Sequence, residues 1–186
     1  MLKYNSAINE IKNYPEIKIS EIEPTTKVNL RGKNRDFITK VGKSLSIIPP
    51  IEPNTSSGND DLSILWLSPD EWMVYSNEKS NLNNSYSLED KLFNEISKVN
   101  LGSVINVTDQ WVTINLKGDK IFELLASGCP FNFNSFKNSK GAVTQTILNH
   151  SDVIIHNQNV NNINLFVRRS FSNHLWLWIN DSVRFL

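Results

Sequence analysis

The sequence predicts an α+β fold composed of two ferredoxin-like half-domains in tandem, each with an antiparallel sheet. The first observation behind this prediction is an internal repeat, because Asn29-Leu30-Arg31-Gly32 recurs as Asn115-Leu116-Lys117-Gly118. In both copies a second glycine follows ten residues after the first, at Gly42 and Gly128. The second observation is that amphipathic helical segments lie between pairs of alternating strands. That order is typical of α+β domains and not of a doubly wound fold.

Each copy of the repeat indicates a strand, a turn around the first glycine, and an amphipathic helix that ends at the second glycine. The apolar residues that mark these helices are Phe37, Val41 and Leu45 in the first copy and Ile121, Phe122, Leu124 and Leu125 in the second. Alternation then predicts two strand pairs. The first joins residues 64–67 to residues 72–75 across a turn that contains Pro69. The second joins residues 104–107 to residues 111–116.

The remaining elements complete the two halves. Further strands are predicted at residues 144–148, 153–156 and 163–167. A helix with one apolar face is expected over residues 88–99, and the last helix runs from Ser170, its N-cap, to about Ser182. Loops are expected from composition at residues 49–61 and 77–85. The predicted boundaries are an N-terminal extension at residues 1–24, a first half-domain at residues 25–100 and a second at residues 101–186.

The composition is that of an ordinary globular protein without overall charge. Of the 186 residues 39% are hydrophobic and 20% charged, and 19 basic residues balance 19 acidic ones. A neutral chain lacks the field that attracts nucleic acid or anionic lipid, so we expect neither as a partner. Charged residues interrupt the first 24 positions, so we expect no signal peptide and no membrane span. With a single cysteine, Cys129, no internal disulfide can form, and we expect a cytoplasmic protein.

The residues that commonly carry chemistry form no recognisable catalytic pattern. The histidines are His150, His156 and His174, and they lack metal-ligand spacing among themselves or with Cys129. Cys129 is expected to fill space near a helix end instead of acting as a nucleophile. The carboxylate pairs Asp60-Asp61 and Asp70-Glu71 lie in a loop and a turn, where solvent should reach them. Gly32 and Gly118 stand singly and cannot cradle a phosphate. We therefore predict no catalytic, cofactor-binding or metal-binding residue.

Two features near the C-terminus could contact a ligand or a partner. Arg168 and Arg169 precede the last helix, where they either bind an anion at its positive end or pair with Asp or Glu. The stripe of this helix assigned to the core comprises Phe171, Leu175, Trp178, Ile179 and Ser182. Trp176 and Leu177 fall outside the stripe, so either a partner or a neighbouring loop covers them. We predict both as residues of a partner interface, with Trp176 exposed in the free chain.

Several stretches, taken in their order and spacing, resemble the gamma-subunit family of heterotetrameric sarcosine oxidase. They are Leu67-Ser68-Pro69-Asp70-Glu71-Trp72, Val107-Thr108-Asp109-Gln110-Trp111-Val112, Gly118 followed by Leu124-Leu125-Ala126-Ser127-Gly128-Cys129-Pro130-Phe131, Gln145-Thr146 with Leu148, and Arg169-Ser170-Phe171 with Leu175, Trp176 and Trp178. Together they span residues 25–182, nearly the whole chain.

This resemblance implies a fold similar to the folate-binding domain of the glycine-cleavage T-protein, an aminomethyltransferase. It also implies a non-catalytic accessory gamma subunit that assembles with alpha, beta and delta subunits into a heterotetramer. Such a complex oxidises sarcosine with oxygen to glycine, hydrogen peroxide and formaldehyde, and tetrahydrofolate captures the formaldehyde. FAD, FMN, NAD and tetrahydrofolate are then expected in the partner subunits, with no cofactor in this chain.

Two alternative functions stay open at the level of sequence. One is a stand-alone folate-dependent enzyme similar to the aminomethyltransferases. It would need an acidic residue to hold the pterin ring, and the nearby candidates, Asp109 and Asp119, both lie in predicted turns. The other is an assembly module for an oxidoreductase that acts on another N-methyl amine. Co-purification separates these possibilities, because an accessory chain should carry large flavin-containing subunits with it.

Overall fold

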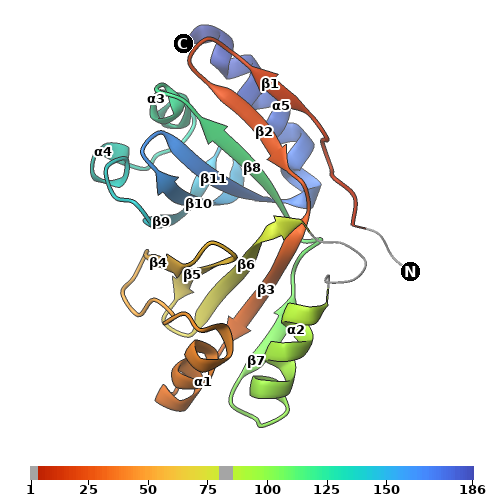
Figure 1. The fold of residues 1–186 in the computed structure, drawn as a ribbon. Coiled ribbons are helices and arrows are strands. Elements are labelled where there is room, and N and C mark those ends of the chain that lie inside the picture. Colours follow the sequence, from red (N-terminus) through yellow and green to blue (C-terminus); the bar gives the residue numbers. More distant parts are fainter. Residues whose placement is uncertain (1–3, 80–85) are drawn as a thin grey trace. The chain divides into compact units, whose positions relative to one another are not determined.

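The computed structural model describes residues 4–79 and 86–186, which form two compact units. The first unit is built from Pro24–Thr108, and the second from Asn5–Glu23 together with Asp109–Leu186. Each unit contains one antiparallel sheet and its own helices (Figure 1). The predicted α+β class with two antiparallel sheets is therefore confirmed.

The first unit has a five-stranded sheet in the order β4-β5-β6-β3-β7. Its strands are β3 (Thr25–Arg31), β4 (Ser56–Gly58), β5 (Leu62–Ser68), β6 (Glu71–Lys79) and β7 (Ser103–Asn106), and its helices are α1 (Arg35–Leu45) and α2 (Ser87–Leu92), the latter continuing as a π-helical turn at Phe93–Ser97. The predicted hairpin is confirmed, since β5 and β6 pair with Ile64 opposite Val74. The loop predicted at residues 77–85 starts later than expected, because β6 extends to Lys79, and residues 80–85 lie outside the described part of the chain.

The second unit has a six-stranded sheet in the order β1-β2-β8-β11-β10-β9. Its strands are β1 (Ile11–Asn13), β2 (Lys18–Ile22), β8 (Trp111–Lys117), β9 (Val143–Leu148), β10 (Ser151–Asn159) and β11 (Asn162–Arg168). Its helices are α3 (Ile121–Ala126), α4 (Phe133–Phe136) and α5 (Ser172–Ser182), with 3-10 turns at Arg169–Phe171 and Val183–Phe185 on either side of α5. The strands predicted at residues 111–116, 144–148, 153–156 and 163–167 are present as β8, β9, β10 and β11.

Five strands of the two sheets follow the same spatial order once they are matched, and β1 is an additional strand at the edge of the second sheet. In the first unit β3 lies between β6 and β7, and β5 and β4 follow on the β6 side. In the second unit β8 lies between β11 and β2, and β10 and β9 follow on the β11 side. Both orders contain the antiparallel arrangement of a ferredoxin-like half-domain, with α1 and α3 each following the central strand. The strand next to β8 is supplied from the N-terminal segment, whereas its counterpart next to β3 follows α2.

The two repeat glycines occupy equivalent positions in these sheets. Gly32 follows β3, and its N–H donates to the carbonyl oxygen of Asp70 at 3.1 Å. Gly118 follows β8, and its N–H donates to the carbonyl oxygen of Asn161 at 3.0 Å. Asp70 immediately precedes β6, which pairs with β3. Asn161 immediately precedes β11, which pairs with β8. The shared hydrogen bond supports the predicted repeat.

Two expectations about strands and helix ends are wrong. Residues 104–107 and 111–116 do not form a hairpin, because β7 pairs with β3 and β8 pairs with β2 and β11. A short turn joins them in sequence, yet their pairing partners lie in different units, and local alternation carries no information about such long-range pairing. Gly42 does not end the first helix either. It lies inside α1, and Ser46 adopts the left-handed conformation at the C-cap with φ 56°.

The predicted half-domain boundaries also differ from the division seen in the structure. Residues 5–23 are no separate extension, because β2 pairs with β8 along the edge of the second sheet. Residues 101–108 belong to the first unit, where β7 completes the sheet beside β3. Hydrogen bonding of β2 explains this arrangement, since its backbone groups find partners only in the second sheet among the described residues.

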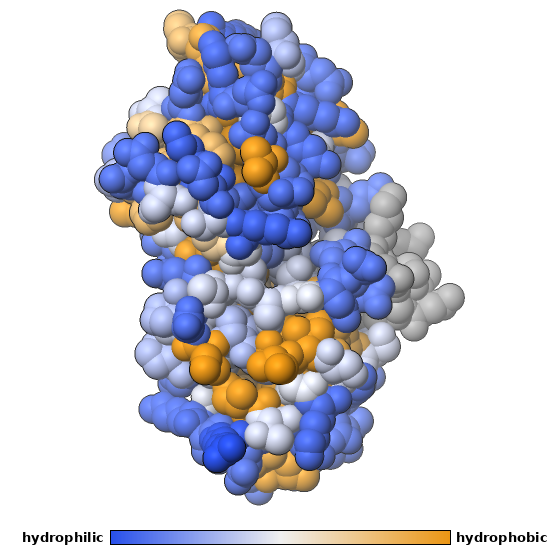
Figure 2. All heavy atoms as spheres, turned by 60° about the vertical axis from the view of Figure 1, so that its left-hand side comes forward, coloured by the Kyte–Doolittle hydropathy of each residue, from blue (hydrophilic) through white to orange (hydrophobic). Residues whose placement is uncertain are grey.

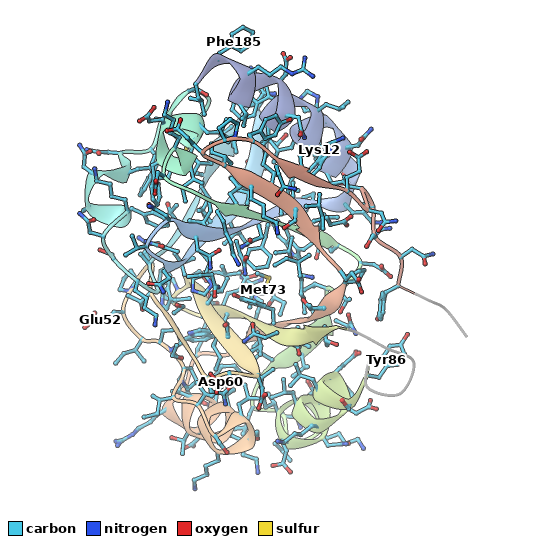
Figure 3. The ribbon with its side chains drawn as sticks, turned by 45° about the horizontal axis from the view of Figure 1, so that its top comes forward. Lys12, Glu52, Asp60, Met73, Tyr86 and Phe185 are labelled. Carbon is cyan, nitrogen blue, oxygen red and sulfur yellow. The ribbon has the colours of Figure 1, made fainter. Side chains whose placement is uncertain are left out.

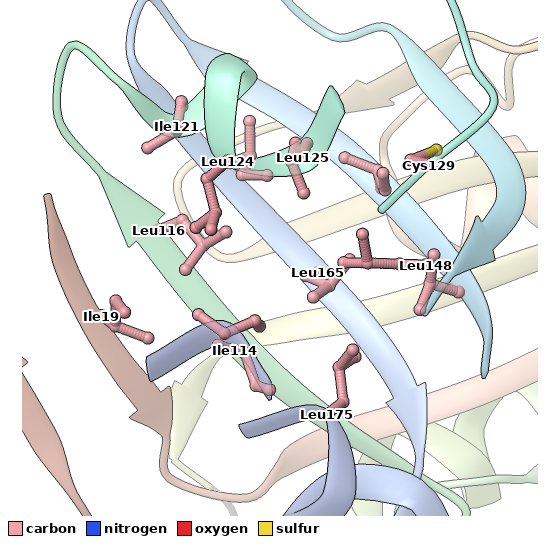
Figure 4. Close-up of a cluster of buried hydrophobic side chains, with 14 of the residues drawn as sticks. Ile19, Ile114, Leu116, Ile121, Leu124, Leu125, Cys129, Leu148, Leu165 and Leu175 are labelled. Carbon is pink, nitrogen blue, oxygen red and sulfur yellow. The ribbon is translucent and has the colours of Figure 1, made fainter. Parts of the chain in front are cut away.

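Each unit has its own hydrophobic core between one sheet face and the helices. In the first unit Phe37 and Val41 of α1 pack with the buried strand residues Val28, Leu30 and Val74. The core of the second unit combines Ile17, Ile19, Ile114, Leu116, Ile121, Leu124, Leu125, Leu148, Leu165, Leu175, Trp176 and Ile179 with further apolar residues. Figure 4 shows part of this second cluster, in which side chains from β2, β8, α3 and α5 converge.

Candidate functional site

The interface predicted on the last helix is only half compatible with the structure. Trp176 is 2% exposed and belongs to the core of the second unit, so the prediction that it is exposed in the free chain is wrong. Leu177 is 62% exposed, which is compatible with the predicted interface. The buried positions along α5 and the turn after it are Ser172, Leu175, Trp176, Ile179 and Val183. These positions follow helical spacing and define the true core face.

The predicted stripe is right at Leu175 and Ile179, which are buried, and wrong at Phe171, which is not in phase with α5. Phe171 lies in a 3-10 turn, which advances with three residues per turn instead of 3.6, and the α-helix starts at Ser172. Phe171 is accordingly 50% exposed. The apolar run from Leu175 to Ile179 leaves the sequence compatible with more than one buried face, and only packing decides between them.

Exposed apolar side chains lie on α5 and on either side of it. Phe171 precedes the helix, Leu177 lies in its middle, and Phe185, which follows it, is 83% exposed. Figure 3 shows Phe185 projecting from the C-terminal turn. Removing apolar side chains from water is energetically favourable, which is why exposed apolar clusters often mark interaction surfaces.

The arginines ahead of α5 have partners within the second unit. The Arg168 guanidinium lies over the Trp111 ring, 4.4 Å from its centroid. Arg169 lies 3.9 Å from the Asp109 carboxylate and donates to the carbonyl oxygen of Asn5 at 2.8 Å. The structural interpretation of Arg169, an arginine paired with an aspartate at a strand exit, is therefore confirmed.

The histidines and the cysteine each have different neighbours. His156 is buried on β10, and burial lowers its pKa to about 4, so the ring is neutral near pH 7. Its Nδ1 lies 2.7 Å from Nε2 of Gln158. His174 contacts the side-chain amide of Asn149, and the Cys129 thiol lies 3.4 Å from the Thr146 hydroxyl in the core. Across residues 4–79 and 86–186, no group of three or more His, Cys, Asp or Glu side chains could hold a metal ion.

The carboxylates singled out from the sequence lie at the surface. Asp61 is exposed, whereas Asp70 accepts from the Ser68 hydroxyl at 2.8 Å, and this hydrogen bond lowers its pKa. Asp109 and Asp119, the candidates for holding a pterin ring, are both exposed. Asp119 accepts from the Asn161 amide at 2.5 Å. In the described part of the chain no helix is both long and apolar enough to cross a membrane.

Sequence reasoning missed a surface pocket on the first unit. It has a volume of about 300 Å³ and lies beside the start of α1. Its lining residues are Gly32, Lys33, Asn34, Arg35, Ile38, Ile51, Pro53, Trp66, Pro69 and Trp72. We call it the Trp66 pocket. A faint signal existed in the sequence, because the segment from residue 49 to residue 53 places isoleucine among three prolines, yet composition alone predicted only a loop.

The comparison with protein families identifies the chain. Residues 31–184 match the sarcosine oxidase, gamma subunit family, and this range includes α1 of the first unit and α5 of the second. The chain belongs to this family. The resemblance noted in the sequence is thereby confirmed. No curated protein sequence matches the chain.

Solved structures show the same fold. A chain of the heterotetrameric sarcosine oxidase from Corynebacterium sp. U-96, in complex with pyrrole 2-carboxylate, matches with a TM-score of 0.81 and 19% identity, over 94% of this chain and 87% of that one. Aminomethyltransferase T of the glycine cleavage system from Bartonella henselae matches with a TM-score of 0.64 and 14% identity. That match covers 88% of this chain but 45% of the aminomethyltransferase. The predicted likeness to the aminomethyltransferase fold is confirmed, and at these identities the likeness concerns fold alone.

Proposed function

We propose that this chain is the gamma subunit of a sarcosine oxidase, an accessory chain that takes no direct part in the chemistry. The observation that carries this proposal is its membership of the gamma subunit family over residues 31–184. The fold shared with a chain of a heterotetrameric sarcosine oxidase supports it, because the similarity extends over 94% of the present chain.

Under this proposal the partner subunits carry out the chemistry of the complex. Alpha, beta and delta subunits would carry FAD, FMN, NAD and tetrahydrofolate and would oxidise sarcosine with oxygen to glycine, formaldehyde and hydrogen peroxide. The gamma chain would contribute surface to the assembly. Leu177, exposed on α5, is one residue that we place in a subunit contact.

Co-expression tests the proposal directly. The tagged chain is produced together with the products of the neighbouring open reading frames and purified through its tag. We expect larger subunits with flavin absorbance to co-purify and the eluate to form hydrogen peroxide when sarcosine is added. An expression without the tagged chain serves as the control for non-specific retention. Recovery of the tagged chain alone, under conditions in which the other subunits are soluble, would contradict the proposal.

Ligand titration separates the accessory role from a folate enzyme of its own. The isolated chain is titrated with tetrahydrofolate, flavin and nicotinamide dinucleotide in a calorimeter. We expect no measurable heat of binding with any of them, because the proposal assigns these ligands to other subunits. Micromolar binding of tetrahydrofolate would instead favour an aminomethyltransferase-like enzyme.

A further inference from the structure

The Trp66 pocket has a rigid aromatic floor. Trp72 is 4% exposed, and its ring packs against Phe37 with the ring centroids 5.6 Å apart. The indole N–H of Trp72 donates to the carbonyl oxygen of Pro50 at 2.8 Å, which ties the loop between α1 and β4 to the sheet. Trp66 lies opposite Trp72 in the β5–β6 pairing and is only half-buried. The pocket is therefore formed before any partner arrives.

The loop beside the pocket holds apolar side chains in solvent. Ile48 is 82% exposed and Ile51 is 75% exposed. Two hydrogen bonds order the backbone of this loop: the Ser57 hydroxyl donates to the carbonyl oxygen of Ile48 at 2.6 Å, and the Thr55 hydroxyl donates to that of Glu52 at 2.7 Å. Figure 2 shows apolar side chains gathered among polar ones on one face of the first unit. A surface that is apolar and pre-ordered suits binding, since little freedom is lost on contact.

The lining of the pocket is positively charged. It includes Lys33 and Arg35 but no carboxylate, and both cations lie at the start of α1, where the helix dipole adds positive potential. Lys33 lies 3.8 Å from the Asp70 carboxylate, and because its side chain is 84% exposed, a second anion can also reach its ammonium. No ion pair involves Arg35 within residues 4–79 and 86–186. An occupant that carries a carboxylate beside an apolar side chain complements this lining.

We propose that the Trp66 pocket binds a segment of a partner subunit that inserts an apolar side chain between Ile51 and Trp66 and places an Asp or Glu against Lys33 and Arg35. This proposal rests on the proposed role as a gamma subunit. A polypeptide fits better than a small ligand, because the exposed apolar surface continues from the pocket through Ile51 to Ile48 along one loop. Tryptophan and arginine are also enriched among residues that dominate binding at protein interfaces.

Paired surface variants in the assembled complex test the pocket. Ile51→Asp introduces a charge at the mouth of the pocket, and Val160→Asp is the matched control, since Val160 is 72% exposed on the β10–β11 turn of the second unit. We expect the Kd of the chain for the remaining subunits to rise about 30-fold or more with Ile51→Asp and to stay within about 3-fold of wild type with Val160→Asp. Both variants should melt at the wild-type temperature, because neither side chain is packed.

A photo-crosslinking residue at position 51 identifies the occupant. With benzoylphenylalanine in place of Ile51, the assembled complex is irradiated and the crosslinked peptide is sequenced by mass spectrometry. We expect a peptide from another subunit in which an Asp or Glu lies close to the attachment point. Replacing that acid by Lys should weaken assembly with the wild-type chain and restore it with the Lys33→Glu, Arg35→Glu double variant.

The outcomes distinguish this inference from the proposed function. If the wild-type chain joins the other subunits but Ile51→Asp binds as tightly as Val160→Asp, the pocket proposal is wrong and the gamma-subunit role stands. Crosslinking to a second copy of this chain, or to a peptide without an acidic residue, also overturns the proposed occupant. If the wild-type chain does not assemble with the other subunits at all, both proposals fail together.

Discussion

Trp176 and Leu177 are neighbours on α5 with opposite environments. Substituting each of them separately distinguishes a core contribution to stability from a surface contribution to assembly. Trp176 is 2% exposed inside the core of the second unit, whereas Leu177 is 62% exposed. Truncating a buried tryptophan to alanine removes its packing and leaves a cavity, which costs roughly 3–5 kcal/mol of unfolding free energy. For a chain of this size we expect Trp176→Ala to lower the melting temperature by about 10 °C or more. Leu177→Asp should change it by less than about 2 °C.

Far-UV circular dichroism is the appropriate readout, because it does not depend on the fluorescence of the tryptophan that is removed. The same two variants are then compared in the assembly assay, where Leu177→Asp should weaken co-purification while Trp176→Ala should fail mainly through loss of folded chain. A Trp176→Ala variant that melts with wild type would refute the core assignment. A Leu177→Asp variant that assembles normally would remove Leu177 from the proposed interface.

Three further predictions follow from individual contacts. Because the folded-state pKa of His156, about 4, lies below the ordinary 6.5, the unfolded chain binds more protons between these values, and unfolding free energy should fall by up to about 3 kcal/mol as pH drops from 6.5 to 4. Urea titrations at several pH values measure this loss, which His156→Gln should flatten. Gly118→Ala should cost about 2 kcal/mol or more in the same titration, because φ is +136° and a Cβ would overlap the Glu16 carbonyl oxygen. Asn34→Ala should cost about 1 kcal/mol, because Asn34 Oδ1 accepts from the Phe37 N–H at 2.7 Å and caps α1.

Each of these predictions has a result that contradicts it. A wild-type stability profile as steep as that of His156→Gln would place the pH dependence on other groups. Wild-type stability in Gly118→Ala would mean that the backbone at Glu16 adapts without cost. An unchanged midpoint in Asn34→Ala would show that solvent satisfies the first turn of α1 as well as the amide does.

Much of the fold could be predicted because its signals are local. The β5–β6 hairpin follows from alternation on both sides of Pro69, and the pairing of the two strands is confirmed, with Ile64 opposite Val74. The strand, glycine and helix of each repeat are encoded within a few neighbouring residues as well. In both copies the glycine N–H bonds to the turn before the partner strand, so the similarity in sequence corresponds to the same hydrogen bond in space.

The errors in strand pairing and in the half-domain boundaries concern contacts between residues distant in sequence. Residues 104–107 and 111–116 were expected to pair because they are adjacent and both alternate. The structure pairs β7 with β3 and β8 with β2, and no pattern within either strand specifies a partner many residues away. The membership of residues 5–23 in the second unit could not be predicted for the same reason.

The candidate site was harder to predict than the fold because surfaces depend on what packing leaves exposed. On α5 the apolar run from Leu175 to Ile179 could bury several faces, and the 3-10 turn at Arg169–Phe171 shifted the phase. The Trp66 pocket combines residues from α1, β5, β6 and three connecting segments, whose proximity only the folded sheet creates. Composition predicts only a loop around Ile51. The structure shows that this side chain is exposed and lines the pocket.

The two repeat glycines show how one local motif serves two different environments. At Gly32 a side chain would collide with the ring of Phe37, which packs under the start of α1. At Gly118 it would collide with the backbone of Glu16, just ahead of β2, the strand that completes the second sheet from the N-terminal segment. In the first unit the corresponding strand, β7, follows α2, and a Cβ at Gly32 would meet Phe37 of α1. Glycine is therefore required at both positions, at Gly32 because an aromatic ring packs against it and at Gly118 because the backbone ahead of β2 approaches it closely.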